Sequence, residues 1–152
     1  MQNGFFNDVN NDISESQEKI ISLAEAIPAD KYSWRPEEGV RSVSEVLMHI
    51  AGSNYFLISF AGIKTPEGAT EDMGKDVTDK DKILAALKTS FEDLHNNLKK
   101  IDESKLDNEV TMFGSKSTIR NVIFVEMGHL HEHLGQLIAY ARTNGVVPPW
   151  SK

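Results

Sequence analysis

Apolar residues recur every three or four positions in four stretches of the chain, which is the spacing of one face of an α-helix. These stretches cover about residues 3–27, 42–61, 79–101 and 117–144, and breaker-rich or polar segments separate them. The pattern therefore predicts an all-α fold. Four helices joined by two longer connections describe a four-helix bundle with a long crossover connection, and we expect one domain over residues 1–152.

Several of the predicted helix ends carry capping signals. Ser42 and Glu45 have the spacing of a capping box, in which each side chain accepts a hydrogen bond from the backbone of the other residue. Thr78 or Asp79 is a candidate cap at the start of the third helix, and Ser117 is one at the start of the fourth. Gly145 is a candidate for the residue that follows the end of the fourth helix.

The third stretch has an apolar seam with no polar interruption: Leu84, Leu87, Phe91, Leu94, Leu98 and Ile101. This is typical of a bundle core, and His95 lies off the seam, where we expect it at the surface. The connection over residues 62–77 is acidic and poor in apolar residues, which fits a mobile lid or a solvated crossover. Residues 110–114 fit a short extended piece that packs the bundle end.

The fourth stretch differs, because its buried stripe carries polar residues in its middle: Glu126, His129, His133 and Gln136. A buried polar group without a partner costs roughly 1–3 kcal/mol. His129 and His133 are four residues apart, about 40° around a helix axis, so their ring nitrogens can converge on one divalent metal ion. His131 lies about 200° from His129 and is expected to face solvent.

Three neighbouring residues are candidates for chemistry beside such an ion. Glu126 and Gln136 lie one turn either side of the histidine pair, where they could orient a ligand or a water, or simply form interhelical hydrogen bonds. Residues 129–133 also match H-x-x-E-H, in which Glu132 would be a general base. The chain is short for such a peptidase, so the match is treated as mostly coincidence, although Glu132 near the metal stays open.

Two residues outside the fourth stretch have two interpretations each. His49 lies at the border of the apolar stripe of the second helix, and a lone histidine there is more often a hydrogen-bonded boundary residue than a metal ligand. Trp34 lies in a breaker-rich loop. It either plugs one end of the core or lines a ligand pocket.

Composition removes several classes of function. The 152 residues carry a net charge of −7, and no basic run is longer than the pair Lys99–Lys100, so we expect no nucleic-acid partner. Without cysteine there is no disulfide, no thiolate metal site and no protein thiol nucleophile. No signal-like segment and no apolar run of roughly 20 residues is present, so we expect no membrane partner and a cytoplasmic location.

Several features together resemble the DinB/YfiT-like superfamily. They are His49 after a capped helix start, the pair His129 and His133 followed by Gly135-Gln136-Leu137, the segment Trp34-Arg35-Pro36, and the tail over residues 140–150. The resemblance implies a four-helix bundle, often a homodimer, in which His49, His129 and His133 bind a divalent metal. Nickel and zinc are the metals of studied members, and iron, manganese and cobalt are compatible alternatives.

The resemblance also implies a range of activities. Some members are thiol-dependent S-transferases, others isomerise maleylpyruvate, and many have no assigned reaction. We therefore expect a metal-dependent transferase or hydrolase that acts on a small-molecule substrate. Because the chain has no cysteine, any low-molecular-weight thiol must arrive as a cosubstrate. The alternatives are a non-catalytic metal or ligand sensor, and a degenerate bundle whose histidines only pack.

Overall fold

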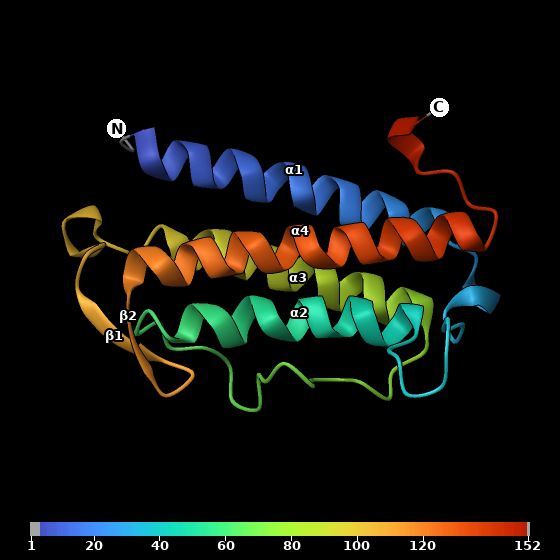
Figure 1. Cartoon of the computed structure of the whole chain (residues 1–152), viewed down its shortest axis with the longest axis horizontal. Helices are drawn as coiled ribbons and strands as arrows, with labels where there is room; N and C mark the ends of the chain where they lie inside the picture. Colours follow the sequence, from blue (N-terminus) through green and yellow to red (C-terminus); the bar gives the residue numbers. More distant parts are fainter. Residues whose placement is uncertain (1–3, 152) are drawn as a thin grey trace.

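The computed structural model describes residues 4–151, and four long α-helices run side by side through it (Figure 1). They are α1 (Gly4–Ala26), α2 (Val43–Ser59), α3 (Lys80–Leu98) and α4 (Ile119–Thr143). Short 3-10 helices lie at Ala29–Lys31, Glu103–Lys105 and Pro149–Ser151. The predicted all-α four-helix bundle is confirmed; residue 3, where the first helix was expected to begin, lies outside the described residues.

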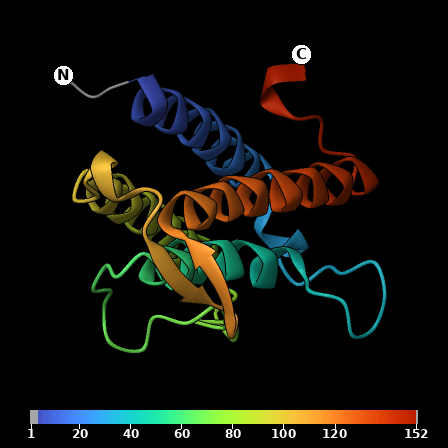
Figure 2. The ribbon, with the colours of Figure 1, turned by 60° about the vertical axis from the view of Figure 1, so that its left-hand side comes forward.

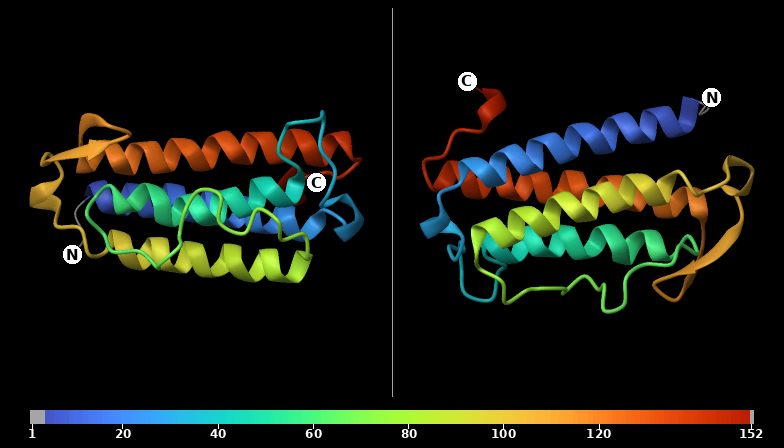
Figure 3. Two further views of the ribbon diagram at one scale, coloured as in Figure 1. Left: turned by 90° about the horizontal axis from the view of Figure 1, so that it is seen from below. Right: turned by 180° about the vertical axis from the view of Figure 1, so that it is seen from behind.

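The order of the helices around the bundle explains the long connection. Helix α4 packs against α1 and α2, and α3 packs against α2 and α1. Helices α2 and α3 are neighbours that run in the same direction (Figure 1), so the chain must return along the length of α2 before α3 begins. Residues 62–77 make this crossover, which lies against the bundle in both views of Figure 3.

The helix starts follow local capping chemistry. In the capping box of α2, Ser42 Oγ accepts from the Glu45 backbone N–H at 3.3 Å, and Glu45 Oε2 accepts from the Ser42 N–H at 2.7 Å. Asp79 caps α3. The prediction of Ser117 as the cap of α4 was wrong by one residue. Strand β2 continues through Ser117 to Thr118, so the helix starts only at Ile119, and Thr118 caps it by accepting from the Asn121 backbone N–H.

Two helices are shorter than the pattern indicated. Helix α2 ends at Ser59 rather than near residue 61, and α3 ends at Leu98 rather than near residue 101. In both places the backbone continues as turns closed by bonds to the third residue back, such as Ala61 to Ile58 and Ile101 to Leu98. These turns keep the apolar side chains near the core beyond the helix end, so the periodicity extends past the helix itself.

A β-hairpin closes one end of the bundle before α4 (Figure 2). Strand β1 (Glu109–Met112) pairs antiparallel with β2 (Ser115–Thr118). The extended piece expected near 110–114 is present, but its partner strand was not predicted. The two turn residues, Phe113 (φ 50°) and Gly114 (φ 77°), both have positive φ, as a two-residue hairpin turn requires. A phenylalanine is unusual in that position and gives no turn signal.

The core of α3 is close to the predicted seam, with one shift and one correction. Ile83 is fully buried, whereas Leu84 is only partly buried. His95 was expected at the surface, but it is half-buried between α3 and α1, where its ring nitrogens contact Asn10 Oδ1 (3.3 Å) and Gln17 Oε1 (2.9 Å). Burial lowers its pKa.

The crossover packs closely on α2, which is therefore buried on almost all sides. A Cβ atom at Gly52 would collide with the carbonyl oxygen of Thr70 and press on Met73 Cβ at 3.3 Å. Most side chains of the crossover are exposed, yet its backbone is in contact with the helix. The prediction of a solvated crossover therefore holds for most of its side chains but not for its backbone at Thr70, which packs on α2. None of the described helices combines the length and apolarity that crossing a bilayer requires.

Candidate metal centre

The structure brings the three predicted histidines together inside the bundle. His49 comes from α2, and His129 and His133 come from successive turns of α4. One ring nitrogen of each lies within 4.8 Å of the others, and the ring centroids are 4.3 to 4.9 Å apart. The His129 and His133 rings converge as their helical spacing predicted, and the imidazole of His49 from the facing helix completes the cluster.

Hydrogen bonds on the far side of two rings fix which nitrogen faces the cluster. His49 Nδ1 lies 3.0 Å from the carbonyl oxygen of Glu71 in the crossover. A carbonyl only accepts, so Nδ1 carries the proton and Nε2 keeps its lone pair. His133 Nδ1 likewise donates to Gln136 Oε1 at 2.8 Å. Both rings therefore present an unprotonated Nε2, the form that a metal ion binds.

A relay of hydrogen bonds ties His133 to the loop before α2. Gln136 Nε2 donates to the hydroxyl of Tyr140 at 3.0 Å, and that hydroxyl donates to the carbonyl of Arg41 at 3.0 Å. The Tyr140 ring also packs edge-on against Trp34, with centroids 5.2 Å apart. Trp34 therefore packs at the end of the bundle, and Gln136 links His133 to Tyr140.

His129 is the ring whose hydrogen bonding is incomplete. Its Nε2 lies 3.0 Å from His49 Nε2, and because that nitrogen is bare, His129 must donate. The other nitrogen, Nδ1, is then a buried acceptor with no partner among the described residues, at a cost of roughly 1–3 kcal/mol. A divalent ion among the three Nε2 atoms would accept a lone pair from each ring, and His129 would then carry its proton on Nδ1. The donor set fits such an ion.

Burial disfavours a positive charge on two of the three rings, His49 and His129. Burial lowers the pKa of His49, and it lowers the pKa of His129 to about 3, with smaller contributions from the charges of His133, His49 and Arg41. Metal ions compete with protons for imidazole nitrogens. Near neutral pH these two rings offer lone pairs without first losing a proton.

Glu126 lies one turn before His129 and is completely buried. With its amide nitrogen turned toward α4, Asn54 donates to Glu126 Oε1 at 3.1 Å, while its amide oxygen accepts from Ser90 Oγ at 3.0 Å. Burial raises the pKa of Glu126 to about 8. Its second oxygen, Oε2, has no partner within residues 4–151, so two unsatisfied polar atoms lie one helical turn apart, on Glu126 and His129.

The other predicted residues of α4 face solvent. Glu132 is exposed and is not part of the histidine cluster. His131 is also exposed, as predicted, and its Nε2 lies 3.0 Å from the carboxylate of Asp12. The H-x-x-E-H match therefore does not bring its glutamate to the same point as the histidines.

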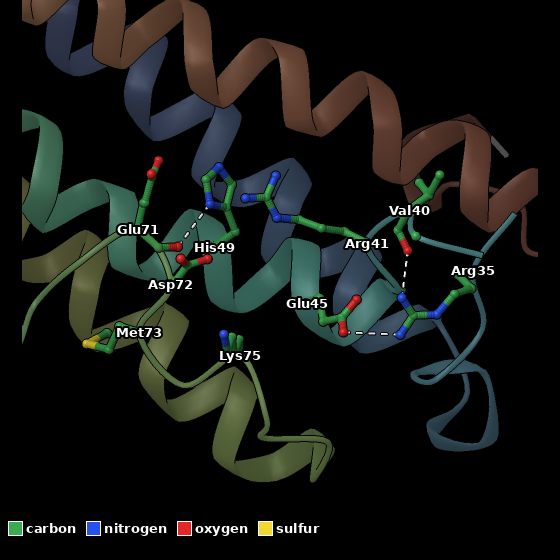
Figure 4. Close-up of a pocket in the computed structure, with 10 residues that line it drawn as sticks. Arg35, Val40, Arg41, Glu45, His49, Glu71, Asp72, Met73 and Lys75 are labelled. Atoms are coloured by element: carbon green, nitrogen blue, oxygen red, sulfur yellow. Dashed lines mark hydrogen bonds and ion pairs between the residues drawn. The ribbon is translucent and has the colours of Figure 1, made fainter. Parts of the chain in front are cut away.

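A small pocket of ≈ 210 Å³ opens beside His49. Its wall includes Arg41, Glu71, Asp72 and Lys75, drawn in Figure 4. Sequence reasoning missed Arg41 and Glu71. Glu71 contacts His49 through its backbone carbonyl, which every residue type has, so its identity gave no signal. Arg41 directly precedes Ser42, the cap of the helix that carries His49, and this position was the signal that could have identified it.

Comparison with known proteins settles the family. A model of the DinB superfamily matches residues 12–137. The chain belongs to the DinB superfamily. Among curated proteins, an uncharacterized protein of Bacillus subtilis strain 168, YjoA, is 31% identical over 126 residues, which cover 81% of this chain and 80% of YjoA.

Three solved structures share the fold of this DinB protein. A DinB-like protein of Bacillus cereus ATCC 10987 superposes with a TM-score of 0.82 at 15% identity, covering 93% of each chain. The B. subtilis YjoA structure gives 0.72 at 24% identity, over 92% of this chain and 94% of YjoA. B. subtilis YfiT, described as a probable metal-dependent hydrolase with an unusual four-helix bundle topology, gives 0.74 at 16% identity, over 97% and 91%. At these identities the likeness establishes the fold.

Proposed function

We propose that this DinB protein is a divalent-metal-dependent enzyme acting on a small molecule, either by thiol-dependent S-transfer or by hydrolysis. The observation that carries the proposal is the convergence of His49, His129 and His133 beside a pocket. The description of YfiT as a probable metal-dependent hydrolase supports the hydrolytic alternative.

The ligand set favours catalysis over a structural role. Three neutral imidazoles leave a divalent ion with its full charge and with an open position, as in catalytic rather than structural sites. Nickel and zinc are the first candidates, with iron, manganese and cobalt behind them. When bound, such an ion lowers the pKa of a coordinated thiol or water toward neutrality.

The protein's own residues position the ligands. The Glu71 carbonyl holds the His49 ring, and Gln136 with Tyr140 holds the His133 ring. Glu126 offers an unsatisfied buried oxygen one turn from His129, which makes it the best candidate to accept the Nδ1 proton of that ring. Since the chain has no cysteine, a reacting thiol would be a cosubstrate.

The proposal also includes a homodimer in the cytoplasm. Light scattering after size-exclusion chromatography tests the dimer, since a single chain has a mass of 17.0 kDa.

Metal content tests the site directly. The protein is purified without chelator, and its metal is quantified for the wild type, for His133→Ala and for His131→Ala, an exposed histidine two residues away that serves as a matched control. We expect about one ion per chain in the wild type and the control, and almost none in His133→Ala. Full metal content in His133→Ala would contradict the site.

Two further measurements separate the alternatives. Metal-dependent turnover in a panel of thiols, electrophiles and esters supports an enzyme, whereas binding without turnover supports a sensor. A metal that binds only the native state raises the unfolding midpoint. An unchanged midpoint would favour a degenerate bundle.

A further inference from the structure

Arg41 places an unpaired positive charge beside the histidine cluster. Its guanidinium lies next to the His49 ring at the pocket wall (Figure 4). No hydrogen bond or ion pair of this guanidinium is present in the part of the chain that the structure describes, although five N–H donors are available.

The backbone around Arg41, in contrast, is held on both sides. Arg35 donates from Nη1 to the carbonyl of Val40 at 2.7 Å and pairs with Glu45 at 3.1 Å. The hydroxyl of Tyr140 donates to the carbonyl of Arg41 itself at 3.0 Å. The fold therefore fixes the backbone of Arg41, while its exposed side chain makes no hydrogen bond or ion pair within residues 4–151.

The charge is directed at the candidate metal centre. In Figure 4 the Arg41 guanidinium lies beside the His49 ring, and after burial its positive charge is a smaller cause of the lowered pKa of His49 and of His129. Of the acidic residues of the pocket, Glu45 is paired with Arg35. Glu71 and the Arg41 guanidinium lie on opposite sides of the His49 ring in Figure 4, and Asp72 lies below that ring. The pocket wall carries three cations, Arg35, Arg41 and Lys75. The Arg35 guanidinium is already bonded to the Val40 carbonyl and to Glu45, which leaves Arg41 and Lys75 for an entering anion.

We propose that Arg41 binds a carboxylate of the substrate or cosubstrate, so that the enzyme acts on a compact carboxylate-bearing molecule. This inference rests on the proposed function, because it identifies the protein group that would hold the non-reacting end of the substrate. The planar guanidinium fork matches a carboxylate with two parallel hydrogen bonds. At ≈ 210 Å³ the pocket is smaller than the usual range of roughly 300–1,000 Å³ for ligand pockets, which favours a small molecule.

The test uses two ligands that differ only in the anionic group, 3-mercaptopropionate and 3-mercapto-1-propanol. Each is titrated into the full-length protein with and without Co²⁺. Affinity is read from the ligand-induced rise of the unfolding midpoint, and, in the cobalt form, from thiolate-to-cobalt absorption. We expect the carboxylate to bind about tenfold more tightly or better in the wild type, and the two ligands to bind equally in Arg41→Gln.

Arg142→Gln is the matched control, because it removes one positive charge from the exposed last turn of α4. It should keep the full preference, and Arg41→Lys should keep part of it, since the charge remains without the fork. Equal binding of both ligands by the wild type, or a preference that survives in Arg41→Gln, would overturn the proposal. Cobalt uptake separately reports on the metal site, and the midpoint measurement without Co²⁺ still tests Arg41 if no cobalt binds.

Discussion

Helices α3 and α4 are both long amphipathic helices of the same bundle, yet they use their buried stripes differently. The stripe of α3 is mostly apolar, with Ile83, Leu87, Phe91 and Leu94 fully buried. Its two buried polar residues, Ser90 and Asn97, are both hydrogen bonded. The stripe of α4 carries four polar residues, of which Glu126 and His133 are buried and His129 and Gln136 are partly buried. Glu126 and His129 each keep one unsatisfied atom. Burial alone therefore does not distinguish the two helices, whereas the satisfaction of polar groups does.

The difference teaches where stability and chemistry lie in this molecule. Substitutions in the stripe of α3 should change the free energy of unfolding and leave ion binding intact. Substitutions in the middle of α4 should change ion binding or its pH dependence more than they change packing. The following experiments test this separation, from the largest expected effect to the smallest.

Phe91→Ala should lower the free energy of unfolding by about 3–5 kcal/mol, because it leaves a cavity in the bundle core. Phe91 is fully buried in the stripe of α3. Denaturant unfolding measures the loss, and the metal content of the folded fraction should match the wild type. A loss of metal without a loss of stability would contradict the proposed separation.

Glu126→Gln should flatten the pH dependence of stability. Burial raises the pKa of Glu126 to about 8 in the folded chain, from an ordinary 4.5. The folded state therefore holds a proton that the unfolded state loses between these values, so the wild type loses stability as the pH rises from about 4.5 to about 8, by on the order of a few kcal/mol.

The neutral glutamine carries no such dependence. Unfolding of chelator-treated wild type and Glu126→Gln, compared at pH 4.5 and pH 8, measures the difference. The two proteins should diverge with increasing pH, with the variant becoming the more stable. Parallel pH profiles would mean that Glu126 is charged in the folded protein.

Gln136→Ala should weaken metal binding by about 10- to 100-fold, because it removes the acceptor that orients His133. Competition with a coloured chelator gives the affinity. Gln17, a half-buried residue of α1 that contacts His95 away from the cluster, offers a matched control in Gln17→Ala. Equal affinities for both variants would remove the positioning role of Gln136.

His131→Ala should change the free energy of unfolding by less than about 0.5 kcal/mol, since its contact with Asp12 is exposed. Thermal unfolding at pH 7 is sufficient to measure it. A large loss would show that the exposed face of α4 is as important for stability as its buried stripe.

Sequence patterns predicted those parts of this fold that depend on local chemistry. The capping box of Ser42 and Glu45 and the convergence of His129 with His133 each involve residues within one turn of a helix, so spacing was sufficient. The placement of His49 beside them was an expectation from family resemblance. The residue spacing within α2 alone could not have predicted that His49 lies beside His129 and His133.

The missed features depend on contacts between distant segments. The carbonyl of Glu71 reaches His49 across 22 positions in the chain, and the hydroxyl of Tyr140 reaches Arg41 across 99. Such bonds form only once the helices are packed, so a periodicity argument cannot find them. The error at Ser117 is more local: the Phe113–Gly114 turn gives no clear signal, so the strand that runs through Ser117 to Thr118 was not predicted.

Gly52 touches no imidazole, but it lets the crossover backbone rest on α2 at Thr70, next to Glu71, whose carbonyl holds His49. A single methyl group added at this glycine would push the crossover backbone away from α2 and loosen the hydrogen bond that holds the His49 ring. Substitution should therefore be tolerated at most exposed side chains of the crossover, whereas at Gly52, in the helix beneath it, even a small added group should disturb the support of His49.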